Sequence, residues 1–317
     1  MDTSKYSSSD LALVVPSKNR PIQVGKLLRS ILGQSMMPGL IVLVDFGGAS
    51  KKVCKSFLGQ LKIIYINSPV PGQIYQRNLG LQFLNDSFKL IGFIDDDLVF
   101  EPKAIAEMIN FWNNAPKTTG GVGFNVINSP PFKFSPLLYF FGMSSRFPGK
   151  VLKTGYNVSI QNISDNIQSE WLGGGFTVWS IQILKHYKQD SIKTRWAIGE
   201  DVRFSYQIGK RFPLFICSLA KVRHEHVNDQ YARNMVHFYR GRQGIIAHRY
   251  FIEQHPQDFL VLFFFWMVWG KFILRIIKSL LNLSWPDLMR GVGEMTGLIL
   301  CFISLIRGKS IRNWLED

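Results

Sequence analysis

The chain has 317 residues, of which 46% are apolar, and it carries a formal net charge of +15. This length and apolar content exclude a peptide module, a disulfide-stapled mini-domain and a disordered chain. The excess of positive charge favours phosphates, nucleotides, nucleic acid or anionic lipid as partners without choosing among them. Three scattered cysteines lack zinc-site spacing, and the polar residues 1–10 lack the apolar run of a signal peptide. We therefore expect disorder over residues 1–10 and a cytoplasmic domain after it.

Residues 11–123 alternate short apolar runs with segments of helical period, which is typical of βα units around a mostly parallel sheet. We therefore expect an α/β domain over residues 11–250. Ligands of open α/β sheets bind beyond the carboxyl ends of the strands, so one cleft could hold the polar residues 17–20, Asp45 and Asp95–Asp97. The predicted strands cover residues 11–16, 40–45, 62–67, 90–95 and 214–222, and the predicted helices cover 22–32, 73–84 and 200–209, with another near Ile181.

Residues 128–170 are rich in Pro, Ser, Asn and Phe and show neither a helical nor a strand period. This composition predicts an insertion or lid within this domain and not a separate domain.

The last sixty residues differ in character from the rest of the chain. Two apolar runs of twelve residues, 259–270 and 295–306, are shorter than the ~20 residues that a perpendicular membrane span needs. Lys271, Arg275 and Lys278 recur on one face of a helix after the first run. Aromatic-rich apolar faces beside a basic stripe suit helices lying in the interface of an anionic leaflet. We therefore expect residues 251–317 to attach the protein to a membrane surface, through residues 258–310. The alternatives are a tilted or re-entrant span, and ordinary core helices or an oligomer interface.

Three consecutive acids, Asp95, Asp96 and Asp97, come at the end of a predicted strand. Neighbouring carboxylates repel one another, and a hard divalent cation such as Mg²⁺ or Mn²⁺ commonly neutralises them at such a place. A cation of this kind bridges to phosphates. The alternatives are a solvated acidic turn or a helix N-terminus served by Asp97.

A second acidic pair, Glu200 and Asp201, opens the predicted helix over residues 200–209. Acids in a first helical turn ordinarily interact with the helix dipole, which is the alternative to a catalytic role. Upstream, Trp171 precedes a run of glycines that includes Gly173 and Gly174. Such glycines let a ligand approach the backbone, or else meet a loop's need for positive φ, and the indole offers a stacking surface for a sugar ring.

His224 and His226 follow the last predicted strand at a spacing that directs both to the same side of an extended segment. Either imidazole can supply a metal ligand, although surface or core histidines are the commoner case. Arginines on the following helix form either a solvated basic face or a clamp for a diphosphate, because guanidinium forks match phosphate oxygens. These arginines are Arg233, Arg240, Arg242 and Arg249.

Several classes of protein lack their signatures in this chain. The first strand is not followed by the G-x-G-x-x-G of a dinucleotide-binding dehydrogenase, and no Walker loop or G-x-S-x-G elbow occurs. No nucleic-acid-binding motif accompanies the positive charge, so we expect no nucleic-acid partner.

Taken together, these motifs resemble those of the inverting family 2 glycosyltransferases, over about three quarters of the chain. The resemblance implies a GT-A fold, which is a Rossmann-like, mostly parallel central sheet flanked by helices. Phe46 stands where the family usually has a second acid. The motifs occur in order at residues 14–21, 44–50, 72–80, 95–97, 171–175 and 200–201, and a histidine follows them.

The resemblance also implies roles for individual residues. Asp201 would be the general base, Glu200 would position it, and Asp95, Asp97 and one of the two histidines would hold the cation. The donor would be bound by residues from five of the motifs and from the helix after the histidines. These residues are Pro16, Ser17, Asn19, Arg20, Asp45, Arg77, Asn78, Asp95, Asp96, Trp171, Gly173, Gly174, Arg233 and Arg240.

The implied reaction is transfer of a single sugar from a nucleotide sugar, with a UDP-sugar expected, to a glycan acceptor with inversion. The implied cofactor is Mn²⁺ or Mg²⁺, and the implied acceptor is a lipid-linked glycan at the cytoplasmic face of the cell membrane, in cell-envelope polysaccharide assembly. A catalytically silent membrane-attached scaffold and a sugar nucleotidyltransferase are the alternatives. The scaffold would need neither acidic cluster, and the nucleotidyltransferase would need a Gly-rich, Lys-bearing loop that the sequence lacks after the first strand.

Overall fold

The computed structural model describes residues 6–190, 192, 198–225 and 234–315. The chain divides into two compact units, and each is described by itself. The first unit comprises Met1–Phe132, Ser159–Ser191 and Phe204–Val227, and the second comprises Lys133–Val158, Ile192–Arg203 and Asn228–Asp317. His226 and Arg233 lie outside the described residues, so their roles stay predictions.

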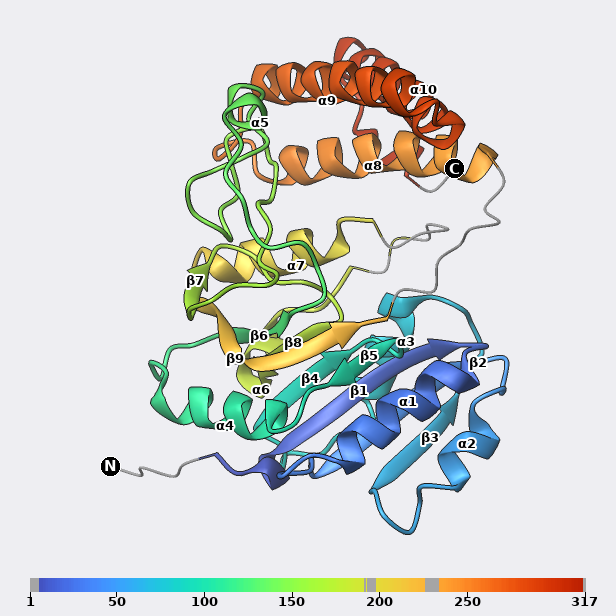
Figure 1. Ribbon diagram of the computed structural model, residues 1–317, viewed down its shortest axis with the longest axis vertical. Helices are drawn as coiled ribbons and strands as arrows, with labels where there is room; N and C mark the ends of the chain where they lie inside the picture. Colours follow the sequence, from blue (N-terminus) through green and yellow to red (C-terminus); the bar gives the residue numbers. More distant parts are fainter. Residues whose placement is uncertain (1–5, 191, 193–197, 226–233, 316–317) are drawn as a thin grey trace. The chain divides into compact units, whose positions relative to one another are not determined.

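The first unit begins with alternating strands and helices (Figure 1). A short 3-10 helix, Ser8–Asp10, precedes them where we expected disorder. Four of these strands and two of these helices agree with the predicted ones to within a few residues, whereas the elements over residues 51–55, 98–100 and 104–114 were not predicted. The strands are β1 (Leu11–Lys18), β2 (Leu40–Phe46), β3 (Ile63–Asn67), β4 (Leu90–Ile94) and β5 (Leu98–Phe100), and the helices are α1 (Pro21–Leu32), α2 (Lys51–Lys55), α3 (Gln73–Leu81) and α4 (Ala104–Asn114).

The later part of the first unit adds four strands and a short helix, of which we predicted one strand and the helix. They are β6 (Gly121–Val126), β7 (Ile167–Ser169), β8 (Phe176–Ser180), α6 (Ile181–His186) and β9 (Leu214–His224). Helix α7 (Glu200–Gly209) begins within the second unit and continues into the first at Phe204.

The described strands form one mixed sheet in the order β3-β2-β1-β4-β8-β6-β9-β5, with β7 also paired to β9. Strands β3, β2, β1 and β4 are parallel, β8 is antiparallel to both β4 and β6, and β6 is parallel to β9. Parallel strands are covered on both faces, and accordingly all of β4 and all of β1 except Lys18 are buried. The expected mostly parallel sheet of the GT-A type is confirmed.

The second unit contains three long helices, α8 (Asn234–Gln254), α9 (Val261–Asn282) and α10 (Trp285–Ile306). It also holds α5 (Pro136–Phe140) and a 3-10 helix, Ile311–Trp314. Helix α8 runs through residue 250, where we expected the catalytic domain to end. The Ser284 hydroxyl caps α10 by accepting a hydrogen bond from the backbone N–H of Asp287 at 3.3 Å, and an acid in the first turn favours a helix start.

Helices α9 and α10 have 22 residues each, so both are longer than the twelve-residue apolar runs on which we based our prediction. Each is about 33 Å long at 1.5 Å per residue. Among the described helices, α10 alone has the length and the apolar composition that a membrane crossing requires, which by itself is weak evidence of one.

The basic stripe of α9 faces acids of α10. Lys271 and Arg275 pair with Glu294 at 3.2 and 2.9 Å, and Arg275 and Lys278 pair with Asp287 at 3.1 Å each. Glu294 is 1% exposed, and a carboxylate buried to this extent requires paired cations. Our expectation that this stripe would contact anionic lipid is therefore wrong for Lys271 and Arg275, because a helical spacing does not reveal which neighbour the stripe meets.

Helices α8 and α10 cross at glycines that bring their backbones together. A Cβ at Gly293 would lie 2.0 Å from the carbonyl oxygen of Phe238, and one at Gly241 would lie 2.3 Å from that of Arg290. Only hydrogen atoms fit at these positions, so the glycines fix how closely the two helices approach.

We expect Gly293→Ala to destabilise the protein by about 1–3 kcal/mol, because the added methyl group forces two backbones apart. The matched control is Gly244→Ala in α8, where an added Cβ would meet nothing within 4 Å. The control should stabilise the protein by up to about 1 kcal/mol, because alanine favours a helix. Urea unfolding of both variants checks this pair, and equal midpoints would contradict the close crossing.

Candidate functional site

Asp95 is held in place from three sides at the end of β4. The guanidinium Nη2 of Arg77 donates to its Oδ1 at 2.9 Å, and the amide of Gln73 donates to the same oxygen. Its backbone N–H donates to the carbonyl oxygen of Gly175 at 2.8 Å. A Cβ at Gly175 would come within 1.9 Å of the Asp95 carboxyl group. Gly175 is therefore required for the carboxylate to occupy this position.

Asp96 is bonded to the loop after β1. Its carboxylate accepts hydrogen bonds from the hydroxyl of Ser17 at 2.8 Å and from the guanidinium of Arg20 at 3.0 Å. Burial raises the pKa of Asp96 to about 6, against the opposing effects of Ser17 and Arg20. Ser17 and Arg20, which we expected to contact the donor, thus organise the acidic cluster.

Asp97 pairs with His224 across the antiparallel pair of β5 and β9. The Nε2 of His224 lies 2.8 Å from Oδ1 of Asp97, and Arg20 donates to the other oxygen at 3.1 Å. Burial alone would lower the pKa of His224, but the hydrogen bond and the charge of Asp97, with that of Asp95, outweigh it and raise the pKa. The side chain of Asn128 fixes His224 further by bonding to its backbone N–H and carbonyl.

The side chains of Asp95, Asp97 and His224 each offer one ligand atom, and these atoms lie within 4.8 Å of one another. Two carboxylate oxygens and one imidazole nitrogen form a donor set suited to a divalent cation. The nitrogen suits Mn²⁺ better than Mg²⁺, which prefers oxygen and water alone. The structure therefore brings together three of the four residues that we predicted as metal ligands.

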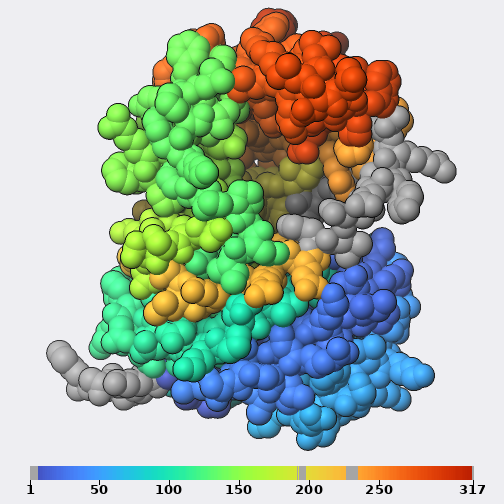
Figure 2. All heavy atoms as spheres, in the orientation of Figure 1, coloured from blue at the N-terminus to red at the C-terminus, as the bar shows by residue number. Residues whose placement is uncertain are grey.

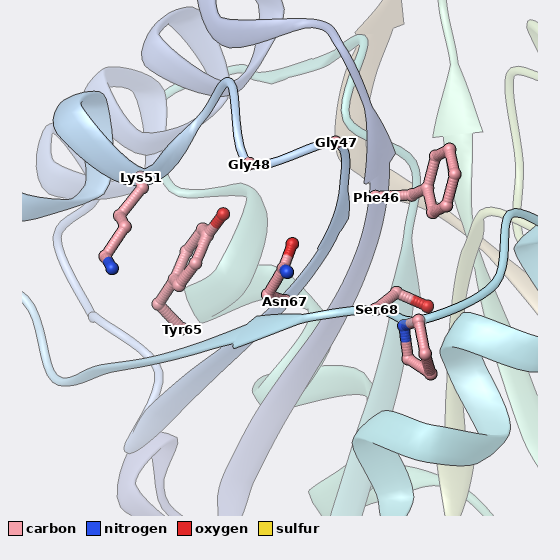
Figure 3. Close-up of a pocket in the computed structure, with 8 residues that line it drawn as sticks. Phe46, Gly47, Gly48, Lys51, Tyr65, Asn67 and Ser68 are labelled. Carbon is pink, nitrogen blue, oxygen red and sulfur yellow. The ribbon is translucent and has the colours of Figure 1, made fainter.

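An open pocket of about 520 Å³ lies beyond the carboxyl ends of β2 and β3 (Figure 3). Figure 3 shows the side chains of Tyr65 and Asn67, which share one face of β3, pointing toward the turn at Gly47 and Gly48. Aromatic rings and an amide in one pocket can stack on a planar ring and hydrogen-bond to its edge. The pocket is lined by Phe46, Gly47, Gly48, Lys51, Tyr65, Asn67, Ser68 and Pro69.

Asp45, which we expected to contact the nucleotide, is fully buried and does not line this pocket. Its Oδ2 accepts hydrogen bonds from the backbone N–H of Ser50 at 2.8 Å and from the hydroxyl of Tyr65 at 3.0 Å. Its Oδ1 has no hydrogen-bond partner among the described residues. Asp45 thus fixes Tyr65, which does line the pocket, and keeps one unused acceptor.

One face of α3 is hydrogen-bonded to the ends of three strands. Of the residues on this face we predicted Arg77 but not Gln73 or Gln76. The amide of Gln76 donates to the carbonyl oxygens of Ser17 at 2.7 Å and Val44 at 2.6 Å. Gln76, Gln73 and Arg77 lie on one face of α3, because they are three and four residues apart. This polar spacing can be recognised in the sequence. Asn78, expected beside the nucleotide, instead donates to the carbonyl oxygen of Gln189 at 3.1 Å.

The two remaining residues of the loop after β1 occupy different surroundings. Pro16 lies within β1 and pairs in register with Val44. Asn19 adopts a positive φ of 55°. A Cβ added at Gly47 would lie only 2.2 Å from the side-chain oxygen of Asn19. Asn19 therefore lies directly against the turn that borders the pocket.

The segment that begins at Trp171 packs into the first unit. The indole of Trp171 is 7% exposed, so little of it is available for stacking on a sugar. The backbone of Leu172 exchanges hydrogen bonds with the hydroxyl of Ser205. A Cβ at Gly173 would overlap the ring of Phe176, and Gly174, its neighbour, is partly exposed.

Glu200 and Asp201 begin α7, after Gly199 with a φ of 69°. Glu200 is buried, and Asp201 accepts a hydrogen bond from the backbone N–H of Val202 at 2.8 Å. Both acids belong to the second unit, as does Arg240, whereas Asp95–Asp97 belong to the first. That the two acidic clusters face a shared cleft stays a prediction.

We expect Gly175→Ala to weaken Mn²⁺ binding about 10- to 100-fold, the usual cost of disturbing a group that orients a metal ligand. The new methyl group would displace the Asp95 carboxylate from Arg77. Gly59→Ala is the control, because a Cβ there meets nothing within 4 Å. Calorimetric titration with Mn²⁺ measures both, and unchanged affinity in Gly175→Ala would exclude Asp95 as a ligand.

The chain is similar to a known family in sequence and to known proteins in fold. The sequence model of glycosyl transferase family 2 matches residues 12–172, about half of the chain. No curated protein matches the sequence.

Among solved structures, the chain is similar to TarS of S. aureus, with 12% identity and a TM-score of 0.48 over 78% of this chain and 43% of TarS. The chain thus spans less than half the length of that TarS chain. For TarS residues 1–349 the identity is 11% and the TM-score 0.48, over 94% and 92% of the two chains.

The mannosyltransferase PcManGT from Pyrobaculum calidifontis, solved in complex with GDP-Man and Mn²⁺, has 12% identity and a TM-score of 0.51 over 96% of this chain and 83% of its own. At this identity the likeness concerns the fold. The family match covers β1 to β7, the acidic cluster and the pocket beyond β2 and β3. The chain belongs to glycosyl transferase family 2.

Proposed function

We propose that this glycosyltransferase moves a single sugar from a nucleotide sugar to a hydroxyl group of a lipid-linked glycan, with inversion at the anomeric carbon. The observation that carries the proposal is the set of Asp95, Asp97 and His224 at the sheet edge where the pocket beyond β2 and β3 also opens. The three side chains can hold a cation that binds a diphosphate, and the pocket can hold a nucleotide base. A diphosphate and a base are the two parts that these donors share.

The proposed donor is a UDP-sugar. The ring of Tyr65 offers a stacking surface, and the amide of Asn67 can both donate to a carbonyl group and accept from an N–H group on the edge of uracil. PcManGT binds GDP-Man, so the base remains the part of the donor that most needs a test.

Asp95, Asp97 and His224 would hold Mn²⁺, and a bound cation would offset the negative charge that grows on the leaving diphosphate. Arg20 and Arg77 would keep the carboxylates in position, since each already pairs with one of them. Arg233 and Arg240 would assist at the diphosphate.

The proposed base is Asp201, with Glu200 positioning it. The acceptor hydroxyl would attack the anomeric carbon from the side opposite the diphosphate, and Asp201 would accept its proton as the new bond forms and the bond to the diphosphate breaks. A positioned general base typically contributes roughly 10²–10⁴-fold to such a step.

The proposed location is the cytoplasmic face of the cell membrane, in cell-envelope polysaccharide assembly. The apolar exposed faces of α9 and α10 support attachment to a membrane, where an acceptor carried on a lipid would be available.

We expect Asp201→Asn to lower turnover of the preferred nucleotide sugar by roughly 10²–10⁴-fold while the donor still binds. Asp97→Asn should instead raise the Mn²⁺ concentration needed for half-maximal rate. Asp86→Asn, an exposed acid that pairs with Lys185, is the control and should leave both quantities unchanged. Nucleotide release measured against Mn²⁺ concentration separates these effects. Equal turnover in Asp201→Asn and wild type would reject Asp201 as the base.

We expect UDP to raise the melting temperature in the presence of Mn²⁺ more than GDP, TDP or CDP does, since a ligand that binds the folded form stabilises it. Asn67→Leu should remove the difference among the nucleotides, because leucine keeps the volume but loses both hydrogen-bonding groups. A panel of nucleotides read by thermal shift measures this. A selectivity that survives Asn67→Leu would show that the base lies elsewhere.

A further inference from the structure

We infer that the insertion over residues 133–158 is a membrane-contact element, which together with α9 and α10 forms one surface that lies on an anionic bilayer. The inference deepens the membrane attachment included in the proposed function and rests on it for biological context only. It assigns to this part of the insertion a role other than the substrate lid that we expected from its composition.

Large hydrophobic side chains are exposed along both α9 and α10. On each helix the exposed residues recur at spacings of three, four and seven, which places them on a single face. On α9 they include Leu262, Trp266, Trp269, Ile273, Ile277 and Leu280. On α10 they include Trp285, Val292, Ile299, Phe302 and Ile306.

Both faces point away from α8. The opposite face of α10 packs on α8 through Gly293 and Gly297, and the opposite face of α9 is buried at Phe264, whose ring lies 5.5 Å from that of His248 in α8. Figure 1 shows α9 and α10 together on one side of α8. Two long apolar faces on one side of a unit exceed the scattered apolar residues of an ordinary soluble surface.

The insertion is fastened to the same layer. The indole N–H of Trp266 donates to the carbonyl oxygen of Phe140 at 2.9 Å, and the ring of Phe141 occupies the space beside Gly270, where a Cβ would lie 2.1 Å from it. Figure 1 places α5 beside α9, and Figure 2 shows the green insertion next to the red helices. The apolar surface therefore continues from α9 onto the insertion.

The exposed side chains of the insertion extend that surface. Leu137, Tyr139, Phe140 and Phe147 are 55, 60, 63 and 67% exposed, respectively. The side chains of Leu137, Phe140 and Phe147 have no atom that could hydrogen-bond to the hydroxyl groups of a sugar. Exposed leucine, phenylalanine and tyrosine instead match the interface between lipid chains and head groups.

The charge of the insertion selects an anionic lipid surface as its partner. Residues 133–158 contain four cations, Lys133, Arg146, Lys150 and Lys153, and no acid. Cations beside an apolar face are attracted to anionic head groups. A second copy of the chain, docked symmetrically through the same face, would bring like charges together.

The surface lies along the bilayer and does not cross it. Helix α10 is joined to α8 by the close contacts at Gly293 and Gly297, and α8 carries the charged residues Arg240, Arg242 and Arg249. A crossing α10 would draw these charges toward the hydrocarbon, which is costly. With α9 and α10 parallel to the membrane, α8 stays on the aqueous side.

The test uses the full chain and vesicles of phosphatidylcholine, with and without phosphatidylglycerol, in a flotation assay. Leu137→Ser and Phe147→Ser should each lower partitioning onto the anionic vesicles about tenfold, because each removes one apolar side chain from the contact. Leu58→Ser is the matched control, since Leu58 is 54% exposed on the first unit. It should partition like wild type, and all three variants should keep their melting temperatures.

Four outcomes would overturn the inference. They are wild-type partitioning by both insertion variants, an equal loss in Leu58→Ser, failure of the wild type to bind anionic vesicles, and self-association of the wild type that Leu137→Ser abolishes. The assay is separate from catalysis: nucleotide-dependent thermal shifts should be equal in wild type and Leu137→Ser. If the variants partition as expected but the protein transfers no sugar, the proposed activity is contradicted and the membrane contact is still supported.

Discussion

Three carboxylates on consecutive residues cannot remain together at one strand end unless positive charge separates them. In this protein their partners come from three places that are distant in sequence: the guanidinium groups of Arg20 after β1 and of Arg77 on α3, and the imidazole of His224 at the end of β9. The acidic cluster can therefore form only when these parts of the sheet are assembled. The charge balance of Asp95–Asp97 thus couples the folding of the first unit to the formation of its site.

The same arrangement divides the three acids by task. The carboxylate of Asp96 accepts hydrogen bonds from Ser17 and Arg20 in the loop after β1. The carboxylates of Asp95 and Asp97 lie close to the imidazole of His224. The division follows from burial and pairing, and it explains why a middle acid is present without being a ligand candidate. A tightly held cluster suits a divalent cation, because its ligands need little reorganisation when the cation binds.

The sequence predicted the βα units of the first half closely, because their strands are continuous apolar runs bounded by polar ends. Strands β6 and β8 were missed, although they lie at the centre of the sheet. Gly121 and Gly123 within β6 make room for Trp179 and Ile216, a packing that no local pattern reveals. The three candidate ligands for a cation could be predicted from their motifs and their order. The acidic partners of Arg20 and of Arg275 could not, because they depend on tertiary contacts.

The central claim is that Asp95, Asp97 and His224 hold a divalent cation together. Pulsed electron paramagnetic resonance of Mn²⁺ bound to the protein tests it directly, since an imidazole ligand couples its nitrogen to the metal's electron spin. The account predicts a nitrogen coupling in the wild type that disappears in His224→Gln, while Mn²⁺ remains bound through the carboxylates. Mn²⁺ bound without any nitrogen coupling in the wild type, or with a coupling that persists in His224→Gln, would contradict it.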